Sequence, residues 1–399
     1  MKALLQDIEE RILSDRYNSL IFDVAGDRDV YLVGGYIRDI FRGIESKDRD
    51  FLIGGGLENF VKEINGILEG TVIFFKKGNI RRVVLKNGVT LDFSSPRGTV
   101  EEDLSKRDFT INSIAWCPRS SFIDPLNGFD DLKKKLIRCI SRQNLVSDPL
   151  RIVRAYRFAA DLAGFIEKET RNSLKLLHKK VELVASERIT LEFFTFLNLA
   201  YTSKYLEMAL IDGVLQAIFS ISDKMLGKNV NLIHKLEKTV FKSLPEDFKV
   251  ILNKIFSQNI SHKGLLCLEA LSINGLSIEG KTKLRLSNAL RKRLECAHRG
   301  TLEMKIAKKM VKKNLFDIFM KSGDAALDVL ILSGRVDLIE DHERFKKIWS
   351  NGLLGAVDIM GLSNLYRGKR LGNIIMALKK AEFYGRVKTR KEAIDLIRE

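Results

Sequence analysis

The chain has 399 residues, which is longer than one hydrophobic core usually serves, and its 45% hydrophobic and 30% charged content is typical of a globular protein rather than a disordered one. Its 68 Lys and Arg against 51 Asp and Glu give a formal net charge of +17, which favours a polyanionic partner, nucleic acid before membrane. Acids at Asp7, Glu9 and Glu10 argue against a signal peptide, and no apolar run approaches the roughly 18 residues that span a bilayer, so we expect a cytoplasmic protein that does not enter membranes.

The first third of the chain carries the strand signals. Short apolar runs bounded by Gly or Asn-Gly predict strands at 31–33, 50–53, 72–75, 82–85 and 89–93. Helical patterns interleave with them at 36–42, 57–68 and 100–106. Asn87-Gly88, between the last two strands, predicts a hairpin closed by a tight two-residue turn, because such a turn needs positive φ. Together these elements predict an α/β or α+β head.

Beyond the head the pattern changes to successive helices. Asp148 and Pro149 predict a helix start, with Asp148 as the N-cap and Pro149 at the first helical position. Further helical patterns follow at 174–184, 190–199, 232–241 and 305–319. The 5 prolines of the whole chain also favour a mostly helical protein. We expect a head over 1–137 and helical segments over 138–205, 206–300 and 301–399.

Gly34 and Gly35 stand between a predicted strand and a predicted helix. Glycines at such a turn let the backbone approach a phosphate, and a helix N-terminus offers free N–H groups to an anion. Arg38 could add a charge-assisted contact to the same anion. A Gly-Gly pair is also common in ordinary tight turns, so the pair alone does not identify a phosphate site.

Asp48 and Asp50 begin the next predicted strand. Alternate strand residues share a face, so the two carboxylates project together, about 6.5–7 Å apart along the strand. Two oxygen ligands at that spacing suit Mg²⁺, and a pair of such ions can activate an attacking hydroxyl and neutralise a leaving pyrophosphate. The alternative is two solvated acids where a loop enters a strand. The Gly-Gly-x-x-Arg-Asp segment just upstream favours the metal site.

Several segments, in this order, resemble motifs of the class II tRNA nucleotidyltransferase and bacterial poly(A) polymerase family, within the larger polymerase-β-like group. The matching segments are GGYIRD (34–39), DRD (48–50), KRDFTINSIA (106–115), DPLNGFDDLKKKLIRCI (124–140), DPLRIVRAYRFAADL (148–162), ASERI with a later Glu (185–192) and, faintly, GKRLGNIIMALKKAEFYGRV (368–387). The resemblance is dense from residue 30 to 195 and thin beyond it.

The resemblance implies a fold and an activity. The fold would be α+β, a polymerase-β-like head with a mixed sheet and helices followed by an all-α neck, body and tail. The activity would be addition of nucleotides to an RNA 3′ end without a template. The implied cofactor is Mg²⁺, held by Asp48 and Asp50. Asp92 on a neighbouring strand is a candidate third acid, and a plain exposed strand residue is an equal alternative.

The resemblance also implies which residues bind the nucleotide. The triphosphate would contact Gly34, Gly35, Arg38 and Arg107, with Asp108 and Asn112 in the same motif as Arg107. The helix that begins at Pro149 would carry the residues that select the base.

Asp148 and Arg151 have the hydrogen-bonding groups that such a selection needs. A carboxylate only accepts and a guanidinium only donates, so the pair complements the N4 amine and the acceptors of cytosine, and adenine similarly. Uracil and guanine would each leave buried groups unsatisfied, at roughly 1–3 kcal/mol per group. Arg154 and Arg157 would serve phosphate or orient the pair; without the head motifs, the three arginines would be read as a solvated basic stripe. Ser147 stands where the family commonly has Glu, so the selection here is supported differently or is looser.

A short connection distinguishes activities within the family. Only residues 94–98 separate Phe93 from Thr99, whereas many CCA-adding relatives have a long flexible loop here that is thought to help the switch from C to A. A five-residue connection is near the length of ordinary turns and cannot swing far. The resemblance is therefore greatest to CC-adding enzymes. The alternatives are full CCA addition, A addition, poly(A) synthesis, a nucleotidyltransferase for a small molecule or a protein, and an RNA-binding protein without catalysis.

The C-terminal half carries a cluster of basic residues. Its members are Lys281, Lys283, Arg285, Arg291, Lys292, Arg293, Arg299, Lys305, Lys308, Lys309, Lys312 and Lys313. Such a cluster suits recognition of folded RNA through its shape and backbone. The resemblance implies that the partners are tRNA, through its 3′ end and acceptor/T arm, and CTP or also ATP. The alternative is a basic surface that only favours solubility. The sequence carries no signal for an oligomeric state.

Overall fold

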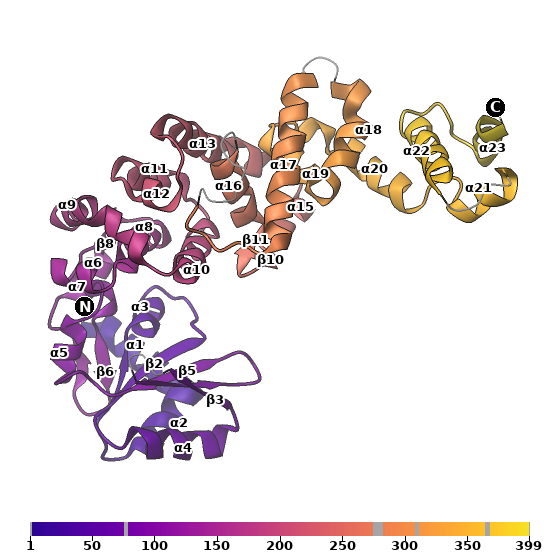
Figure 1. Ribbon diagram of the computed structural model, residues 1–399. Helices are drawn as coiled ribbons and strands as arrows, with labels where there is room; N and C mark the ends of the chain where they lie inside the picture. The colour runs from indigo at the N-terminus through magenta and orange to yellow at the C-terminus, as the bar shows by residue number, and fades with distance from the viewer. Residues whose placement is uncertain (1, 76–78, 274–281, 308–310, 364–367, 399) are drawn as a thin grey trace. The chain divides into compact units, whose positions relative to one another are not determined.

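The computed structural model describes residues 2–75, 79–273, 282–307, 311–363 and 368–398, and Figure 1 shows their helices and strands. The chain divides into two compact units, residues 1–188 with 211–217 and residues 189–210 with 218–399. The division into four domains stays a prediction beside this coarser grouping. Among the helices described, none is both long and apolar enough to cross a membrane.

The first unit is built around a seven-stranded sheet in the order β3-β4-β5-β2-β1-β6-β7 (Figure 1). Its strands are β1 Val30–Val33, β2 Asp48–Ile53, β3 Thr71–Phe75, β4 Ile80–Val84, β5 Thr90–Ser94, β6 Ala115–Cys117 and β7 Ser121–Ile123. Neighbours β2 and β5 are parallel and the other adjacent pairs are antiparallel. The five strand predictions are confirmed. Strands β6 and β7 have three residues each, too few for a period to be recognised.

Helices precede, interrupt and follow this sheet. They are α1 Lys2–Ser14, α2 Arg16–Ala25, α3 Gly35–Phe41, α4 Leu57–Leu68, α5 Val100–Ser105, α6 Gly128–Lys133, α7 Arg142–Ser147, α8 Leu150–Asp161 and α9 Lys168–Leu177. Two 3-10 turns cover Thr110–Asn112 and His178–Leu183, and strands β8 Leu136–Ile137 and β9 Phe165–Ile166 form a small parallel pair. The helices predicted at 36–42, 57–68 and 100–106 are confirmed.

The helix predicted at 174–184 is wrong at both ends. Helix α9 begins earlier because the Glu167 carboxylate caps it, accepting from the Thr170 N–H at 3.1 Å. After Leu177 the chain tightens into 3-10 geometry. A 3-10 turn keeps nearly the same apolar spacing as an α-helix, so the sequence period could not separate the two.

An aromatic core fixes one face of the sheet. Phe51 of β2 stacks on Phe93 of β5 with ring centroids 5.5 Å apart. Phe60 of α4 meets Phe93 at 6.0 Å, and Phe22 of α2 meets Phe51 at 6.0 Å and Trp116 at 5.1 Å. Helices α2 and α4 therefore cover this face (Figure 1). Because strand side chains alternate, Asp48 and Asp50 lie on the opposite face.

The hairpin between β4 and β5 differs from the prediction in its turn. The Leu85 N–H donates to the Val89 carbonyl at 2.9 Å, and the Gly88 N–H donates to the Leu85 carbonyl at 2.9 Å. The loop therefore spans residues 86–88, one more than predicted, and Gly88 supplies the positive φ of 81°. The hairpin itself is confirmed by the antiparallel pairing of the two strands.

The second unit is mostly helical. Its helices are α10 Ser186–Leu197, which begins in the first unit, α11 Ser203–Ile211, which ends in it, α13 Asp223–Lys235, α14 Phe241–Ser243, α15 Glu246–Leu252, α16 His262–Ser272, α17 Asn288–Ala307, α18 Val311–Ser322, α19 Ala326–Leu332, α20 Ile339–Ser350, α21 Ala356–Ser363, α22 Lys369–Phe383 and α23 Arg390–Arg398. Helix α12 Val214–Ile218 belongs to the first unit except for its last residue. A π-helical turn covers Leu236–Val240, 3-10 turns cover Gly323–Ala325 and Val336–Leu338, and strands β10 Ile255–Ser257 and β11 Ile260–Ser261 pair antiparallel.

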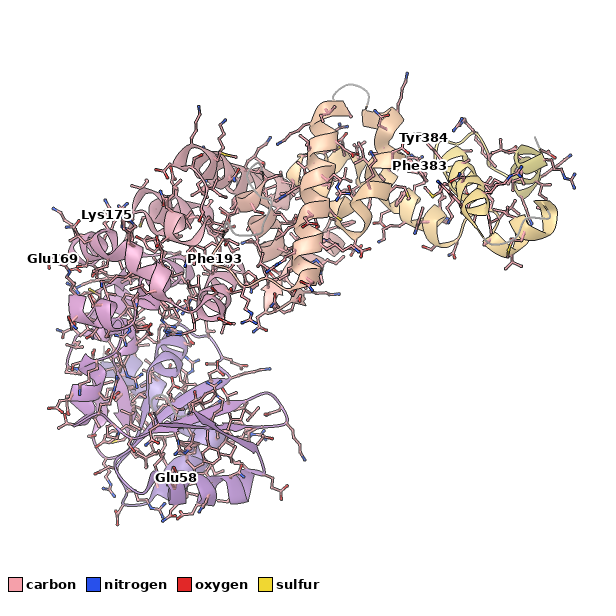
Figure 2. All side chains as sticks on the ribbon, in the orientation of Figure 1. Glu58, Glu169, Lys175, Phe193, Phe383 and Tyr384 are labelled. Atoms are coloured by element: carbon pink, nitrogen blue, oxygen red, sulfur yellow. The ribbon has the colours of Figure 1, made fainter. Side chains whose placement is uncertain are left out.

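Aromatic rings also pack this unit. Phe383 at the end of α22, labelled in Figure 2, meets Phe316 and Phe319 of α18 at 5.7 and 6.3 Å and Phe345 of α20 at 6.2 Å. These contacts join three helices that are distant in sequence.

Three helical patterns of this half have different bounds. Predicted helix 190–199 is α10, which begins four residues earlier. Predicted helix 232–241 falls on the end of α13 and the π-helical turn. Predicted helix 305–319 falls on two helices that pack on each other, the end of α17 and most of α18, and residues 308–310 between them lie outside the described residues.

Candidate active site

The first unit contains a cavity of about 460 Å³ beside the end of β1 and the start of β2. All twelve predicted site residues line it: Gly34, Gly35, Arg38, Asp48, Asp50, Arg107, Asp108, Asn112, Asp148, Arg151, Arg154 and Arg157. They come from segments that are more than 100 residues apart in sequence, so the fold brings the separate motifs to one place.

The backbone at Gly34 passes close to two charged side chains of the cavity. Gly34 has φ 79°, a conformation that side chains other than glycine's rarely adopt. A Cβ on Gly34 would lie 2.8 Å from Arg107 Nη1 and 3.4 Å from Asp50 Oδ2. Because glycine has no Cβ, the guanidinium of Arg107 and the carboxylate of Asp50 can both lie next to the backbone of Gly34.

The two acids of β2 differ in environment. Asp48 is exposed and accepts a hydrogen bond from Thr90 Oγ1. Asp50 lies level with Asp92 of the parallel strand β5. Burial, reinforced by the charges of Asp92 and Asp48 and opposed by Arg107, raises the pKa of Asp50 to about 6.

Asp92 does not line the cavity. Its carboxylate accepts from Arg82 Nε and Nη2 at 2.7 and 2.6 Å, a two-point ion pair. It is neither a plain exposed strand residue nor a free third acid. Among the described residues no group of three or more His, Cys, Asp or Glu is arranged to hold a metal ion, so the structure brings together a pair of acids.

Arg49, between the two acids, points to the opposite face and is 5% exposed. Its guanidinium donates to Asp15 at 3.2 and 2.6 Å and lies over the rings of Tyr17 and Tyr36, 5.2 and 4.8 Å from their centroids. This residue anchors the strand that carries Asp48 and Asp50.

Asn112 links two charged groups of the cavity. Its amide oxygen accepts from Arg38 Nη1 at 2.6 Å, and its Nδ2 donates to Asp108 at 2.9 Å. Asp108 also accepts from Arg154 Nε at 2.8 Å. Burial alone would raise the pKa of Asp108, but Arg154, Asn112 and the Phe109 N–H outweigh it and lower that pKa to about 2. Asp108 is therefore an anion at neutral pH, and it orients Arg154.

Asp148 and Arg151 both line the cavity but have different partners. Asp148 accepts from Arg188 Nη1 and Nη2 at 3.0 and 2.9 Å. Arg151 Nη1 donates to the backbone carbonyls of Arg107 and Asn144 at 2.9 and 3.2 Å. The prediction that Asp148 caps α8 is wrong, because its carboxylate turns to Arg188 and the helix has no side-chain cap.

Arg157 is the last of the predicted site arginines. Its guanidinium lies 4.0 Å from the centre of the Phe158 ring.

The sequence reasoning missed two arginines that line the cavity, Arg97 and Arg188. Arg188 lies in the ASERI segment, where the resemblance gave a motif but no residue role. Arg97 lies in the short connection between β5 and α5, which was read for its length alone.

That connection is held at several points. Thr99 and Glu102 form a capping box at the start of α5, with bonds of 3.1 and 3.2 Å. Arg97 donates to Asp103 from its backbone N at 3.3 Å and from Nε at 2.9 Å, and Lys106 Nζ donates to the Arg97 carbonyl at 2.5 Å. The connection between β5 and α5 is therefore short and fastened to the helix that follows it.

The basic residues of the second unit separate into surface and interior groups. The exposed members of the predicted cluster on α17 and α18 are Lys292, Arg299, Lys305, Lys312 and Lys313. Arg293, also a member of the cluster, is largely buried and forms an ion pair with Asp328 at 2.6 Å, so it is not one of the exposed cations. Lys281, Lys308 and Lys309 lie outside the described residues.

The chain is similar to known proteins over its length. Residues 76–138 match the family described as Poly A polymerase head domain. The CC-adding tRNA nucleotidyltransferase of Geobacter sulfurreducens is 31% identical over 94% of this chain and 93% of its own length. The protein of the same name from Synechocystis sp. is 32% identical over 65% of this chain and 63% of its own. The Thermotoga maritima CCA-adding enzyme, solved in complex with tRNA, has the same fold, with a TM-score of 0.78 over 98% of this chain and 97% of that one at 18% identity.

Proposed function

The chain belongs to the class II tRNA nucleotidyltransferase family, and from this premise we propose that it extends the 3′ end of tRNA by two cytidines, with CTP as substrate and pyrophosphate as product. The terminal hydroxyl of the tRNA would attack the α-phosphate of CTP, forming a new O–P bond while the bond to the β-phosphate breaks. The observation that carries this proposal is that Asp48 and Asp50 line the same cavity as Asp148 and Arg151.

Asp48 and Asp50 are the residues that would hold Mg²⁺. Their donors are hard anionic oxygens, which this ion prefers. The raised pKa of Asp50 reflects a carboxylate whose charge burial penalises, and a bound cation would stabilise that charge. When bound, as one ion or a pair, Mg²⁺ would activate the attacking hydroxyl and neutralise charge on the leaving pyrophosphate.

The chain's own groups would position the triphosphate. The Gly34 turn leaves room beside Arg107 for a phosphate, and Arg38 and Arg107 would donate to its oxygens. Arg154 and Arg157 line the same cavity and would add positive charge. Asp108 and Asn112 would act indirectly, because they orient Arg154 and Arg38.

Asp148 and Arg151 would read the base. A carboxylate oxygen accepts more than one hydrogen bond, so Asp148 bound to Arg188 keeps capacity for the N4 amine of cytosine. Arg151 uses Nη1 for two carbonyls, and its Nε and Nη2 groups remain to donate to N3 and O2. Uracil presents the opposite pattern and would leave both groups unsatisfied.

The fastened connection after β5 supports addition of CC rather than CCA. A connection that is both short and hydrogen-bonded to the segment around α5 is not a flexible loop that could move to change the cavity for ATP. Two relatives that carry the CC-adding name are consistent with this choice. The tRNA would contact the exposed cations of α17 and α18 with its acceptor/T arm and enter the cavity with its 3′ end.

Product length on a trimmed acceptor tests the proposal directly. We expect tRNA that lacks its 3′ CCA to gain two nucleotides with CTP, and no third when ATP is also present. Efficient ATP incorporation after two cytidines would show a full CCA-adding enzyme, and long A tracts a poly(A) polymerase.

The acids are tested by substitution. Asp48→Ala and Asp50→Ala should each abolish incorporation, with a loss of at least about a thousandfold, because the metal would lose a ligand. Filter binding should show unchanged affinity for tRNA. Activity within tenfold of the native protein would remove these residues from the metal site.

A further inference from the structure

Arg151 is held without a carboxylate. Its Nη1 donates to the backbone carbonyls of Arg107 at 2.9 Å and Asn144 at 3.2 Å. In the part of the chain that the structure describes, no acidic side chain forms an ion pair with it. Two neutral acceptors on one nitrogen fix the plane of the guanidinium, because its donors have a rigid fork geometry. The position of those two carbonyls therefore decides where Nε and Nη2 donate.

Asn144 takes part in both contacts, through its side chain at one carbonyl and through its own backbone at the other. The Asn144 Nδ2 amide donates to the carbonyl of Ser105 at 2.8 Å and to that of Arg107 at 2.7 Å. The Arg107 carbonyl thus accepts from Asn144 and from Arg151 together, which occupies both of its lone pairs. The second carbonyl that holds Arg151 belongs to Asn144 itself.

The position of Asn144 is also fixed from its own helix. Its backbone N–H donates to Ser141 Oγ at 3.1 Å, which caps α7. Ser147 Oγ donates to the Asn144 carbonyl at 3.0 Å, so the Ser147 hydroxyl is directed back into α7 rather than toward Arg151. Asn144 consequently connects three segments: α7, the turn after α5 that carries Arg107, and α8 that carries Arg151.

We propose that Asn144 is a positioning residue for base selection, which sets the guanidinium of Arg151 through these two carbonyls; the proposal rests on the proposed role of Arg151. Without the Asn144 amide, the Arg107 carbonyl loses a donor that fixes its direction, and the guanidinium gains freedom to rotate. A rotated guanidinium can hydrogen-bond to uracil as well as to cytosine. The preference for CTP over UTP should therefore fall more than the rate of CTP incorporation.

The test measures kcat/KM for CTP and UTP on trimmed tRNA in a double-mutant cycle. Asn144→Ala should lower the preference for CTP over UTP roughly tenfold or more, the scale expected when one hydrogen-bonded contact no longer discriminates. In an Arg151→Ala background the same substitution should change the preference less than twofold, because the guanidinium through which Asn144 would act is absent. Gln143→Ala, at an exposed neighbouring position on α7, should leave the preference unchanged.

Asn144→Asp serves as a second variant if Asn144→Ala unfolds, since it keeps the size and removes the donor. Equal losses of kcat/KM for both nucleotides, or the same change of preference with and without Arg151, would overturn the positioning role. Failure of the proposed function gives a different result: the native protein would not incorporate CTP, or Arg151→Ala would leave nucleotide preference intact.

Discussion

Asp50 combines a functional position with a cost to folding. Its pKa is raised to about 6, first by burial and then by the neighbouring acids, so the folded chain binds its proton more tightly than the unfolded chain. The stability lost to this carboxylate is therefore largest above pH 6 and is recovered as pH falls through about 6 toward 4. Protonation over the same range would also weaken cation binding, so activity should fall there.

Asp50→Asn should therefore stabilise the protein while inactivating it. Without divalent ions we expect the free energy of unfolding at pH 8 to rise by roughly 1–3 kcal/mol, at about 1.4 kcal/mol per pKa unit, and the gain to vanish near pH 4. Urea unfolding at pH 8, 6 and 4 measures this. Asp48→Asn, at an exposed acid on the same strand, should change stability by less than about 0.5 kcal/mol. An Asp50→Asn protein that is less stable than native at pH 8 would contradict the assigned burial cost.

At the scale of elements, Asp212 joins three segments of the first unit. Its buried carboxylate accepts from Tyr156 Oη of α8 at 2.9 Å and from Arg171 of α9 at 2.7 and 3.0 Å. Lys175 of α9, labelled in Figure 2, lies 3.4 Å away. Burial, and then the charge of Asp212, raises the pKa of Tyr156, so the phenol stays protonated and remains a donor.

Asp212→Ala should destabilise the protein by roughly 2–4 kcal/mol, because the buried phenol and the half-buried guanidinium of Arg171 lose their acceptor. Thermal or urea unfolding measures the change. Glu207→Ala, at an exposed position on α11, should change stability by less than about 0.5 kcal/mol. A loss of similar size at both positions would mean that Asp212 has no special structural role.

The sequence allowed good prediction where local pattern and geometry coincide. Strands β1 to β5 are short apolar runs with Gly or Asn-Gly at their boundaries, and all twelve predicted site residues line one cavity. Long-range pairing was not predictable in the same way. Asp is a residue type that commonly caps helices, but the Asp148 carboxylate instead pairs with Arg188, 40 residues away in sequence. Asn144 belongs to no recognised motif, and its bonds to two carbonyls of another segment leave no local signal.

At the scale of the whole molecule, charge governs the expected encounter with RNA. The net charge is +17, and part of the positive charge lies on the exposed cations of α17 and α18. Each phosphate neutralised by such a residue releases counterions, so affinity falls as salt rises.

Replacing Lys292 and Arg299 together by Ala should weaken tRNA binding and lower the slope of log affinity against log salt by about 1–2, the contribution of one or two phosphate contacts. The KM for CTP should not change. Filter binding across a salt series measures this, with a Lys62→Ala and Lys134→Ala double variant as control, which removes the same charge from exposed positions of the first unit. An equal effect of both double variants would indicate attraction by net charge alone rather than a contact at α17.

Arg49 has a consequence for how the site behaves on warming. The Arg49 guanidinium, on the face of β2 away from the two acids, lies over two tyrosine rings and is bonded to Asp15, so these contacts anchor the strand from that side. Asp48 and Asp50 are thus set at their separation before any ligand arrives, and little entropy remains to be lost there on complex formation. The spacing of the acids should accordingly persist until the head itself melts, so that heat inactivation and loss of the sheet occur at one temperature.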